Sequence, residues 1–459
     1  MTIDEKKTHI LLKDKSIYKG LLYLSLPLML SNLLKSVHDI VDMYFVSDLG
    51  TGSVSSISIT WSMIFIFLAF SFGLGAAGTA LISQYLGAKN HKKAKATASQ
   101  LLLIGIIFGL VFTVLLYSMA PFVLELTGAT GFVYENALKY VRIRSFEMLP
   151  MFVLSVYTAT RQASGDTMSP VIIVVISVVI NIILSPLLIR TYGLGVAGAG
   201  YATLIAMYAV LPATVYYLLF SKSGVTVTIK GLLPNKKIIK EILKIALPSS
   251  LAMAITAIGF TIMNSMIMRQ FGEVVFDAFG VGNRINSMVL LPIIAVGNVL
   301  ATFVGQNVGA LQPERAKLVF KKAVIFTVGF SLVGIAIVIP LRAQIVGLFL
   351  HNAESLQLCI EYMFYLTFTL PFFAVFQLLL GVFAGLGKAK YTLIVSLSRL
   401  WAFRLPMILI FLYFLNMNQN AVWHAMWLSN IFAVILGLYL YSRCTFEPII
   451  LTHEEEDYI

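Results

Sequence analysis

Apolar residues run along this chain in long blocks, separated by short polar stretches rich in Lys, Gly and Pro. About 20 apolar residues in a helix are enough to cross the hydrocarbon core of a bilayer. Twelve blocks reach that length, so the pattern predicts twelve membrane-spanning helices. Their predicted ranges are 21–46, 57–86, 98–120, 138–163, 170–190, 199–221, 242–268, 280–308, 320–341, 359–385, 392–415 and 423–443.

The composition supports this interpretation. Of the 459 residues, 59% are hydrophobic and 12% are charged, and the mean hydropathy is +0.90. Soluble domains carry about 25% charged residues. We therefore expect an all-α polytopic membrane protein that lies in the lipid bilayer. An even number of spans places both termini on the same side of the membrane.

The formal net charge of +12 first suggests a nucleic-acid partner. The basic residues, however, gather in alternate loops, at 87–95, 221–244 and 310–322, and in the N-terminal segment. Such a bias is typical of the cytoplasmic loops of a membrane protein. We therefore expect no nucleic-acid partner. The predicted location is the plasma (cell inner) membrane, with several crossings and both termini in the cytoplasm.

The two ends of the chain and its cysteines add little chemistry. Residues 1–20 form a polar, basic, cytoplasmic segment without the apolar core and cleavage site of a signal peptide. The first span is therefore the expected targeting signal, and 444–459 is an acidic cytoplasmic tail. The two cysteines, Cys359 and Cys444, belong to different segments, which argues against a disulfide framework or a metal cluster.

The chain repeats itself across a polar cytoplasmic linker at 222–241. The stretch SQYLGAKNHKKAK before the linker resembles GQNVGALQPERAK after it, and other pairs show the same shift near 220 residues. Two bundles in one orientation, related by an axis along the membrane normal, are typical of transporters. We predict an N-lobe at 21–221 and a C-lobe at 242–443, two pseudo-symmetric six-helix bundles around a central cavity. The matched pairs are Pro27 and Pro248, Gln84 and Gln306, Gly87 and Gly309, Lys95 and Lys317, Pro150 and Pro371, Gly165 and Gly385, and Pro186 and Pro406.

The first span carries a polar face formed by Lys35, His38, Asp39 and Asp42. At about 100° per residue, these positions share one side of a helix. A charge at the bilayer centre costs at least roughly 2.5–3.5 kcal/mol, so this face must meet a water-filled cavity or protein partners. An ion pair between Lys35 and Asp39 is one interpretation, but it leaves Asp42 unexplained. Asp42 is therefore the main functional candidate, and a bend at Pro27 could move it.

Two arginines, Arg399 and Arg404, lie within the eleventh predicted span. In a structural role, Arg399 could extend to the cytoplasmic face, and Arg404 could pair with backbone carbonyls or with Glu147 of the other lobe. In a functional role, the arginines could attract a phosphate or a carboxylate. Asn264 stands where the repeat places the counterpart of Asp42. The predicted substrate-cavity residues are Lys35, His38, Asn264 and Arg404.

Other classes of protein fit the pattern less well. The sequence shows no nucleophile–base pair, metal cluster or phosphate-binding loop, so we expect no enzyme activity and no cofactor beyond a coupling ion. Ion channels use filter loops or rings of subunits, and no filter loop is visible in the sequence. The best interpretation is a monomeric transporter of small-molecule substrates.

The residues resemble the multidrug and toxic compound extrusion (MATE) transporters over nearly the whole chain. The resemblance rests on LP…D…FVSDLG in the first span, ISQYLGAKN ending the second, ASGD before the fifth and GVAGA opening the sixth, with VGQNVGA and FAGLGKAK in the second half. It implies a V-shaped pair of six-helix lobes that alternate between inward-open and outward-open states. It also implies export of amphipathic, often cationic compounds in exchange for sodium ions or protons.

The sequence resembles the branch of DNA-damage-inducible protein F, in which an acid of the first helix carries the coupling ion. Asp42 occupies that position, and Asn181 and Thr203 match polar residues that the family places around it. Where the family commonly has an acid one turn after this Asn, the chain has Ser185. A hydroxyl is a weaker ligand than a carboxylate for a hard cation such as sodium.

Two coupling ions therefore stay open. A Na⁺ site could form at Asp42, Asn181 and Thr203, with Asp39 supplying the missing charge. A proton on Asp42 needs no ring of ligands, and the neutral Ser185 favours this second interpretation, as does the nearby Lys35. The alternative function within the same superfamily is a flippase or exporter for lipid-linked or anionic metabolites, which the two arginines of the eleventh span support.

Overall fold

The computed structural model describes residues 9–14, 16–47, 49–50, 52–221, 223–350 and 352–450. It does not describe the side chains of residues 38–40, 42, 43 and 47. The described residues form helices joined by short turns, and no strand occurs among them. The predicted all-α fold is therefore confirmed.

The first half of the chain supplies six membrane crossings. Helices α5 and α6 are separated by a two-residue turn and make one crossing together, and α7 continues into the short π-helix η1. The bounds are α2 Ile17–Ser47, α3 Ser53–Gly87, α4 His91–Leu126, α5 Gly131–Ser145, α6 Met148–Ala163, α7 Met168–Pro186, η1 Leu187–Thr191 and α8 Gly195–Phe220.

The second half repeats this arrangement with different breaks. Helix α9 has 74 residues and is broken at Gly272, whose φ of 80° is left-handed, so it crosses twice. Helices α11 and α12 bend by 49° relative to each other. The bounds are η2 Ile229–Leu232, α9 Lys236–Gly309, α10 Pro313–Gly347, α11 Ala353–Phe368, α12 Leu370–Gly385, α13 Ala389–Leu397, η3 Ser398–Arg404, α14 Leu405–Tyr413 and α15 Asn420–Ser442.

The number of crossings agrees with the sequence prediction. By length and composition, the described residues contain nine helices that could cross a membrane, or ten with the bent pair α11–α12. Helix α9 is counted once among the nine, but its break at Gly272 divides it into two crossings. The pair α5–α6 provides the remaining crossing. All twelve predicted spans thus have a helical counterpart in the described part of the chain.

Several helices are longer than the predicted spans because polar caps extend them beyond the apolar blocks. The side chain of Asn235 accepts hydrogen bonds from the backbone N–H groups of Lys237 and Ile238, and α9 therefore begins at Lys236. Helix α8 ends at Phe220, and the predicted linker at 222–241 therefore overlaps the first turns of α9.

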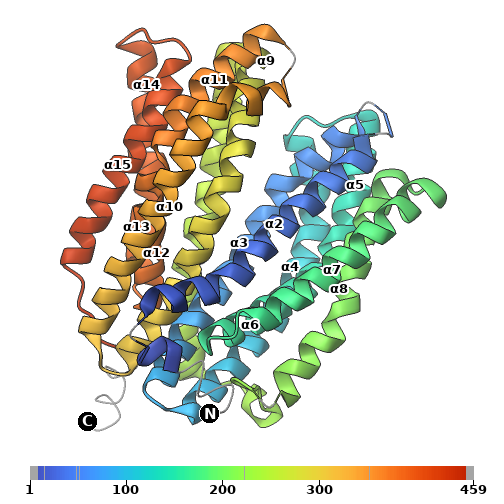
Figure 1. The fold of residues 1–459 in the computed structure, drawn as a ribbon. Coiled ribbons are helices and arrows are strands. Elements are labelled where there is room, and N and C mark those ends of the chain that lie inside the picture. The colour runs from blue at the N-terminus through green and yellow to red at the C-terminus, as the bar shows by residue number, and fades with distance from the viewer. Residues whose placement is uncertain are drawn as a thin grey trace.

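The helices form two bundles that lean apart toward one end of the molecule (Figure 1). The N-lobe contains α2 to α8, drawn blue to green, and the C-lobe contains α9 to α15, drawn yellow to red. The first and last described segments of the chain, around Leu11 and Ile449, lie at the opposite end, where the bundles meet (Figure 1). One apolar core joins residues of both lobes there, since Leu21 and Leu24 of α2 pack with Phe303 of α9 and Phe383 of α12.

Candidate functional site

A pair of glutamines ties the two lobes together at the end where they meet. Gln84 of α3 donates from Nε2 to the carbonyl oxygen of Gly385, the last residue of α12, at 2.9 Å. Gln306 of α9 donates from Nε2 to the carbonyl oxygen of Ala163, the last residue of α6, at 2.6 Å. The two bonds are related by the internal repeat, because each lobe offers one glutamine and one helix-end carbonyl. We call these four residues the glutamine clasp.

Two glycines allow the backbones of α3 and α9 to approach closely beside the clasp. A methyl group added at Gly87 would overlap the Gln306 carbonyl oxygen, and one added at Gly309 would overlap the Gln84 carbonyl oxygen. Any larger residue at either position would therefore clash with the backbone of the other helix. The closed contact between the lobes depends on glycine at both places.

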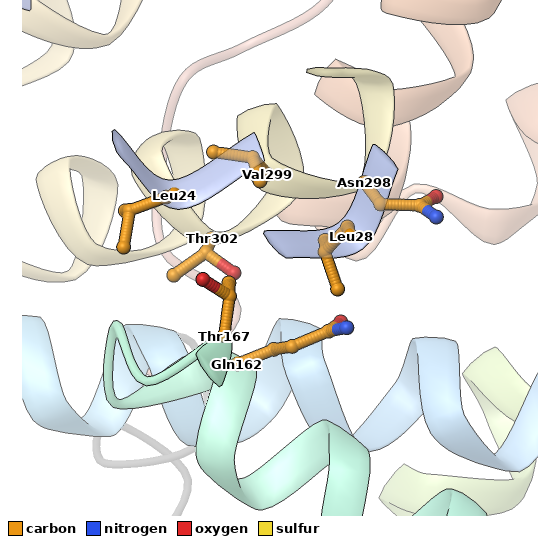
Figure 2. A pocket seen from close by; sticks show the side chains of 7 residues that line it. All are labelled: Leu24, Leu28, Gln162, Thr167, Asn298, Val299 and Thr302. Atoms are coloured by element: carbon orange, nitrogen blue, oxygen red, sulfur yellow. The ribbon is translucent and has the colours of Figure 1, made fainter. Parts of the chain in front are cut away.

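The space between the lobes is closed beside the clasp. Figure 2 shows side chains of α2 and α9 facing Gln162 and Thr167 of the N-lobe across a small gap. This gap is too narrow to admit a water molecule. Its lining residues are Leu24, Leu28, Gln162, Thr167, Asn298, Val299 and Thr302.

Both ends of the chain add hydrogen bonds to this closed end. The backbone N–H of Ile449 donates to Gln84 Oε1 at 2.9 Å, so the C-terminal segment reaches the clasp itself. The side-chain amide of Asn307 donates to the carbonyl oxygen of Leu11 at 3.1 Å. The contact between the lobes therefore includes segments outside the membrane-spanning helices.

In the N-lobe, three of the predicted ion-coupling residues form one buried chain of hydrogen bonds. Ser185 Oγ donates to Asn181 Oδ1 at 3.1 Å, and Asn181 Nδ2 donates to Thr203 Oγ1 at 3.1 Å. The Thr203 hydroxyl in turn donates to the carbonyl oxygen of Ala199 at 3.1 Å. The chain links α7 to α8 and contains neutral groups only. We call Asn181, Ser185 and Thr203 the N-lobe polar triad.

Helix α2 packs along α7, the helix that carries two residues of this triad. The predicted coupling residues Asp39 and Asp42, and the cavity residue His38, belong to α2, but their side chains lie outside the described part of the structure. The Lys35 side chain, by contrast, is described and exposed. Within the described residues, no three His, Cys, Asp or Glu side chains lie close enough to share a metal ion.

In the C-lobe, two arginines of the eleventh crossing donate hydrogen bonds to the twelfth crossing. Arg404 Nε donates to Ser429 Oγ at 3.0 Å, and Arg404 Nη2 lies 3.5 Å from the Met426 carbonyl oxygen. Arg399 Nη1 donates to Asn430 Oδ1 at 3.3 Å. Each guanidinium also lies over a phenylalanine ring. Among the described residues, neither guanidinium has a carboxylate within ion-pair distance.

The structure corrects three predictions about charged residues. Arg404 does not pair with Glu147, whose carboxylate accepts instead from Arg144 of its own lobe. Arg399 does not extend to the cytoplasmic face, because its side chain is buried against Asn430 of α15. Arg404 is 2% exposed and lies inside the C-lobe, which contradicts its assignment to the substrate cavity.

The remaining cavity prediction in the C-lobe concerns Asn264. Its side chain is exposed on the first crossing of α9. Sequence reasoning missed the glutamine clasp as a functional element, although it paired Gln84 with Gln306 in the repeat. The sequence did contain a signal for it. Gln84 and Gln306 stand at matched helix ends, in a chain with few polar residues inside its helices.

Comparison with known proteins identifies the family. The sequence model of the MatE family matches residues 27–187 and again residues 248–410, which together cover more than half of the chain. The chain belongs to the MATE family. Because the model matches once in each lobe of this MATE transporter, it also confirms the internal repeat that the matched prolines and glycines predict.

Curated relatives of this MATE protein include bacterial multidrug resistance and export proteins. It is 26% identical over 416 residues to the "Probable multidrug resistance protein YoeA" of Bacillus subtilis, covering 89% of this chain and 90% of the relative. It is 27% identical over 347 residues to the "Multidrug export protein MepA" of Staphylococcus aureus, covering 74% and 76% of the two chains.

Solved structures share the fold. One is described as an outward-facing conformation of a multidrug resistance MATE family transporter, with a TM-score of 0.90, 24% identity and coverage of 95% of this chain and 97% of that chain. Another is a transporter from Pyrococcus furiosus of the MOP superfamily, with a TM-score of 0.89, 24% identity and the same coverage. These structures show the fold, with its crossings in two bundles, and membership of the MATE family makes the chain a multi-pass membrane transporter rather than an enzyme.

Proposed function

We propose that this MATE transporter is a secondary active antiporter that exports amphipathic, cationic compounds by alternating access. The observation that carries the proposal is the asymmetry of contact between the lobes. They are joined by the glutamine clasp at one end and lean apart at the other (Figure 1). Alternating access requires two such states, each closed at one end. The names of YoeA and MepA as multidrug proteins support multidrug efflux as the activity.

The proposed topology follows from charge and from the closed end. The basic loops lie at the end that holds both termini, which the positive-inside bias assigns to the cytoplasm. The protein would act as a monomer in the plasma membrane. The structure would then represent the outward-open state, with the clasp as its cytoplasmic closure.

We favour a proton as the coupling ion and place it on Asp42. A carboxyl group binds a proton when it is shielded from water and releases it when water or a cation approaches. Exchange follows if the proton and the substrate favour opposite states, since a ligand drives a transition only through differential affinity. The polar triad supports this choice because its three side chains are neutral and supply no carboxylate ligand for a sodium ion. Sodium is the alternative ion, held by Asp42, Asn181 and Thr203 with help from Asp39.

The arginines of the C-lobe favour one other candidate function, the export or flipping of anionic or lipid-linked compounds. Two guanidiniums without a carboxylate among the described residues would attract a phosphate. Their burial inside the C-lobe argues against direct contact with a substrate. Cationic substrates, which would meet the acidic face of α2, therefore remain the first proposal.

Efflux from vesicles under separately imposed proton and sodium gradients tests this function. Ethidium is the probe. The proposal predicts that an imposed proton gradient drives its efflux even when choline replaces all sodium, with the same pH values on the two sides as in the sodium experiment. Loss of efflux in choline, restored by sodium, would assign the coupling to sodium instead. Movement of anionic compounds only, abolished by Arg404→Ala, would favour the alternative function.

A further inference from the structure

The first three turns of α9 present an open face that the transport mechanism does not use. Three lysines and three apolar residues alternate along it at spacings of three and four residues, which places all six on one side of the helix. They line an open hollow of about 440 Å³. The six residues are Lys236, Ile239, Lys240, Leu243, Lys244 and Leu247, and we call this surface the lysine face.

The other side of the same turns is packed against the protein. Ile242, Ile245 and Ala246 are buried and belong to the apolar core of the N-lobe. The three lysines and Leu247 are turned away from this core, and the partly buried Ile239 packs against it at the edge of the lysine face. Its three lysines are exposed, and Leu247 at its inner end is 40% exposed. No carboxylate lines the hollow among the described residues, so its charge is positive only.

The start of α9 is held against α4 of the N-lobe by hydrogen bonds. Gln100 of α4 donates from Nε2 to the carbonyl oxygens of Gly231 and Leu233, at 2.6 and 2.7 Å. The backbone N–H of Asn235 donates back to Gln100 Oε1 at 2.9 Å. Lys236 and Lys240 thus lie between the anchored linker and the predicted span 242–268, and Lys244 lies in the first turn of that span. Lysines at the end of a spanning helix place their charge at the level of the phospholipid headgroups.

We propose that the lysine face binds one anionic phospholipid of the leaflet that contacts the chain termini. The ammonium groups would hold the headgroup phosphate, and an acyl chain would lie along Ile239, Leu243 and Leu247. Lysines at a membrane surface keep their stems on apolar surface and their charge at the headgroup. The alternation of charge and apolar surface suits a lipid better than a nucleic acid or an acidic peptide, neither of which would cover the apolar residues. Each lysine near an anionic lipid contributes a factor of about five in affinity.

Native mass spectrometry of the detergent-solubilised full chain tests the proposal, because it counts bound lipids without any transport assay. Wild-type protein should retain one phosphatidylglycerol at a concentration at least about tenfold below that needed for phosphatidylcholine. The triple variant Lys236→Gln, Lys240→Gln, Lys244→Gln should lose this preference. The matched control carries the same charge change at the turn after α3 and in the first turns of α4, where the exposed Lys89, Lys92 and Lys95 are each replaced by Gln.

Three results would overturn the proposal. The first is equal retention of the two lipids by the wild type. The second is an unchanged preference in the triple variant, or an equal loss in the matched control. The third comes from competition: short-chain dihexanoyl phosphatidylglycerol should displace the bound lipid, and glycerophosphate at the same concentration should not. If glycerophosphate displaces it equally well, the site binds phosphate alone. Leu247→Ser separates these cases further, because it should weaken lipid binding while leaving all three lysines in place.

Discussion

The two lobes place different chemistry between equivalent pairs of helices of one repeated fold. In the N-lobe, the fifth and sixth crossings are joined by the amide of Asn181 and the hydroxyl of Thr203. In the C-lobe, the eleventh and twelfth crossings are joined by the guanidinium of Arg404 and the hydroxyl of Ser429. A neutral contact in one lobe thus corresponds to a positively charged contact in the other.

This difference assigns unequal tasks to the lobes. A buried positive charge raises the cost of binding a cation nearby, because like charges repel strongly where water is excluded. The C-lobe therefore opposes a cation in its own bundle, whereas the N-lobe polar triad does not. We infer that coupling belongs to the N-lobe, with the C-lobe as its structural partner. Four predictions test this division of tasks.

The largest expected effect concerns Asp42. Asp42→Asn keeps the size and polarity of the side chain but removes its ability to bind and release a proton. Gradient-driven ethidium efflux should fall to the level of vesicles without the protein, while membrane insertion stays normal. Asp39→Asn on the same helix is the control and should retain proton-driven efflux. Normal coupled transport by Asp42→Asn would show that the N-lobe acid does not carry the coupling ion.

The second prediction concerns Arg404, for which a structural role predicts a loss of stability. Arg404→Ala should lower the free energy of unfolding by about 3 kcal/mol, because it leaves a cavity between η3 and α15. Arg404→Met should lose less, since it fills the space and the Ser429 hydroxyl still donates to the Met426 carbonyl. Thermal unfolding in detergent measures both variants. Loss of transport by a stable Arg404→Met protein would contradict the structural role and favour an anionic substrate.

The fold followed from the sequence more completely than the site did. Apolar blocks predicted all twelve crossings, because length and hydropathy decide whether a helix spans a bilayer. The repeat predicted the two lobes, and family resemblance brought Asn181, Ser185 and Thr203 together. For Arg404, the predicted contact with a backbone carbonyl is present, at Met426, but the alternative partner Glu147 was wrong, because spacing along one helix does not reveal the neighbouring helix. Ser429 and Asn430 became partners only through the packing of α15.

The third prediction compares the two halves of the glutamine clasp. Gln84→Leu and Gln306→Leu each remove one hydrogen bond between the lobes, worth about 1 kcal/mol. Each should shift the population toward the opposite open state by about fivefold. Gln84→Leu should have the larger effect, because Gln84 also accepts from the Ile449 backbone N–H. Distances between spin labels placed on the two lobes measure the populations. Identical effects would show that the C-terminal segment adds nothing to the closure.

The smallest expected effect tests which side of the membrane the closed end faces. Cys444 follows α15 and is half-buried, whereas Cys359 is buried within α11. Burial raises the pKa of the Cys444 thiol, and Lys388 partly offsets this by favouring the thiolate. Because the thiolate is the reactive form, labelling should be slow at neutral pH and should accelerate as the pH rises toward the raised pKa.

A membrane-impermeant maleimide should therefore label Cys444 in inside-out vesicles and not in intact cells. Labelling of the vesicles should be more rapid at alkaline than at neutral pH. Lys388→Gln removes the offsetting charge, so it should raise the pKa of the thiol further and move the rate profile to higher pH. Cys444→Ser provides the background, to which Cys359 contributes little because it is buried. Labelling from the outside of intact cells would reverse the assigned topology. The glutamine clasp would then close the outer side of the membrane, and the structure would represent the inward-open state.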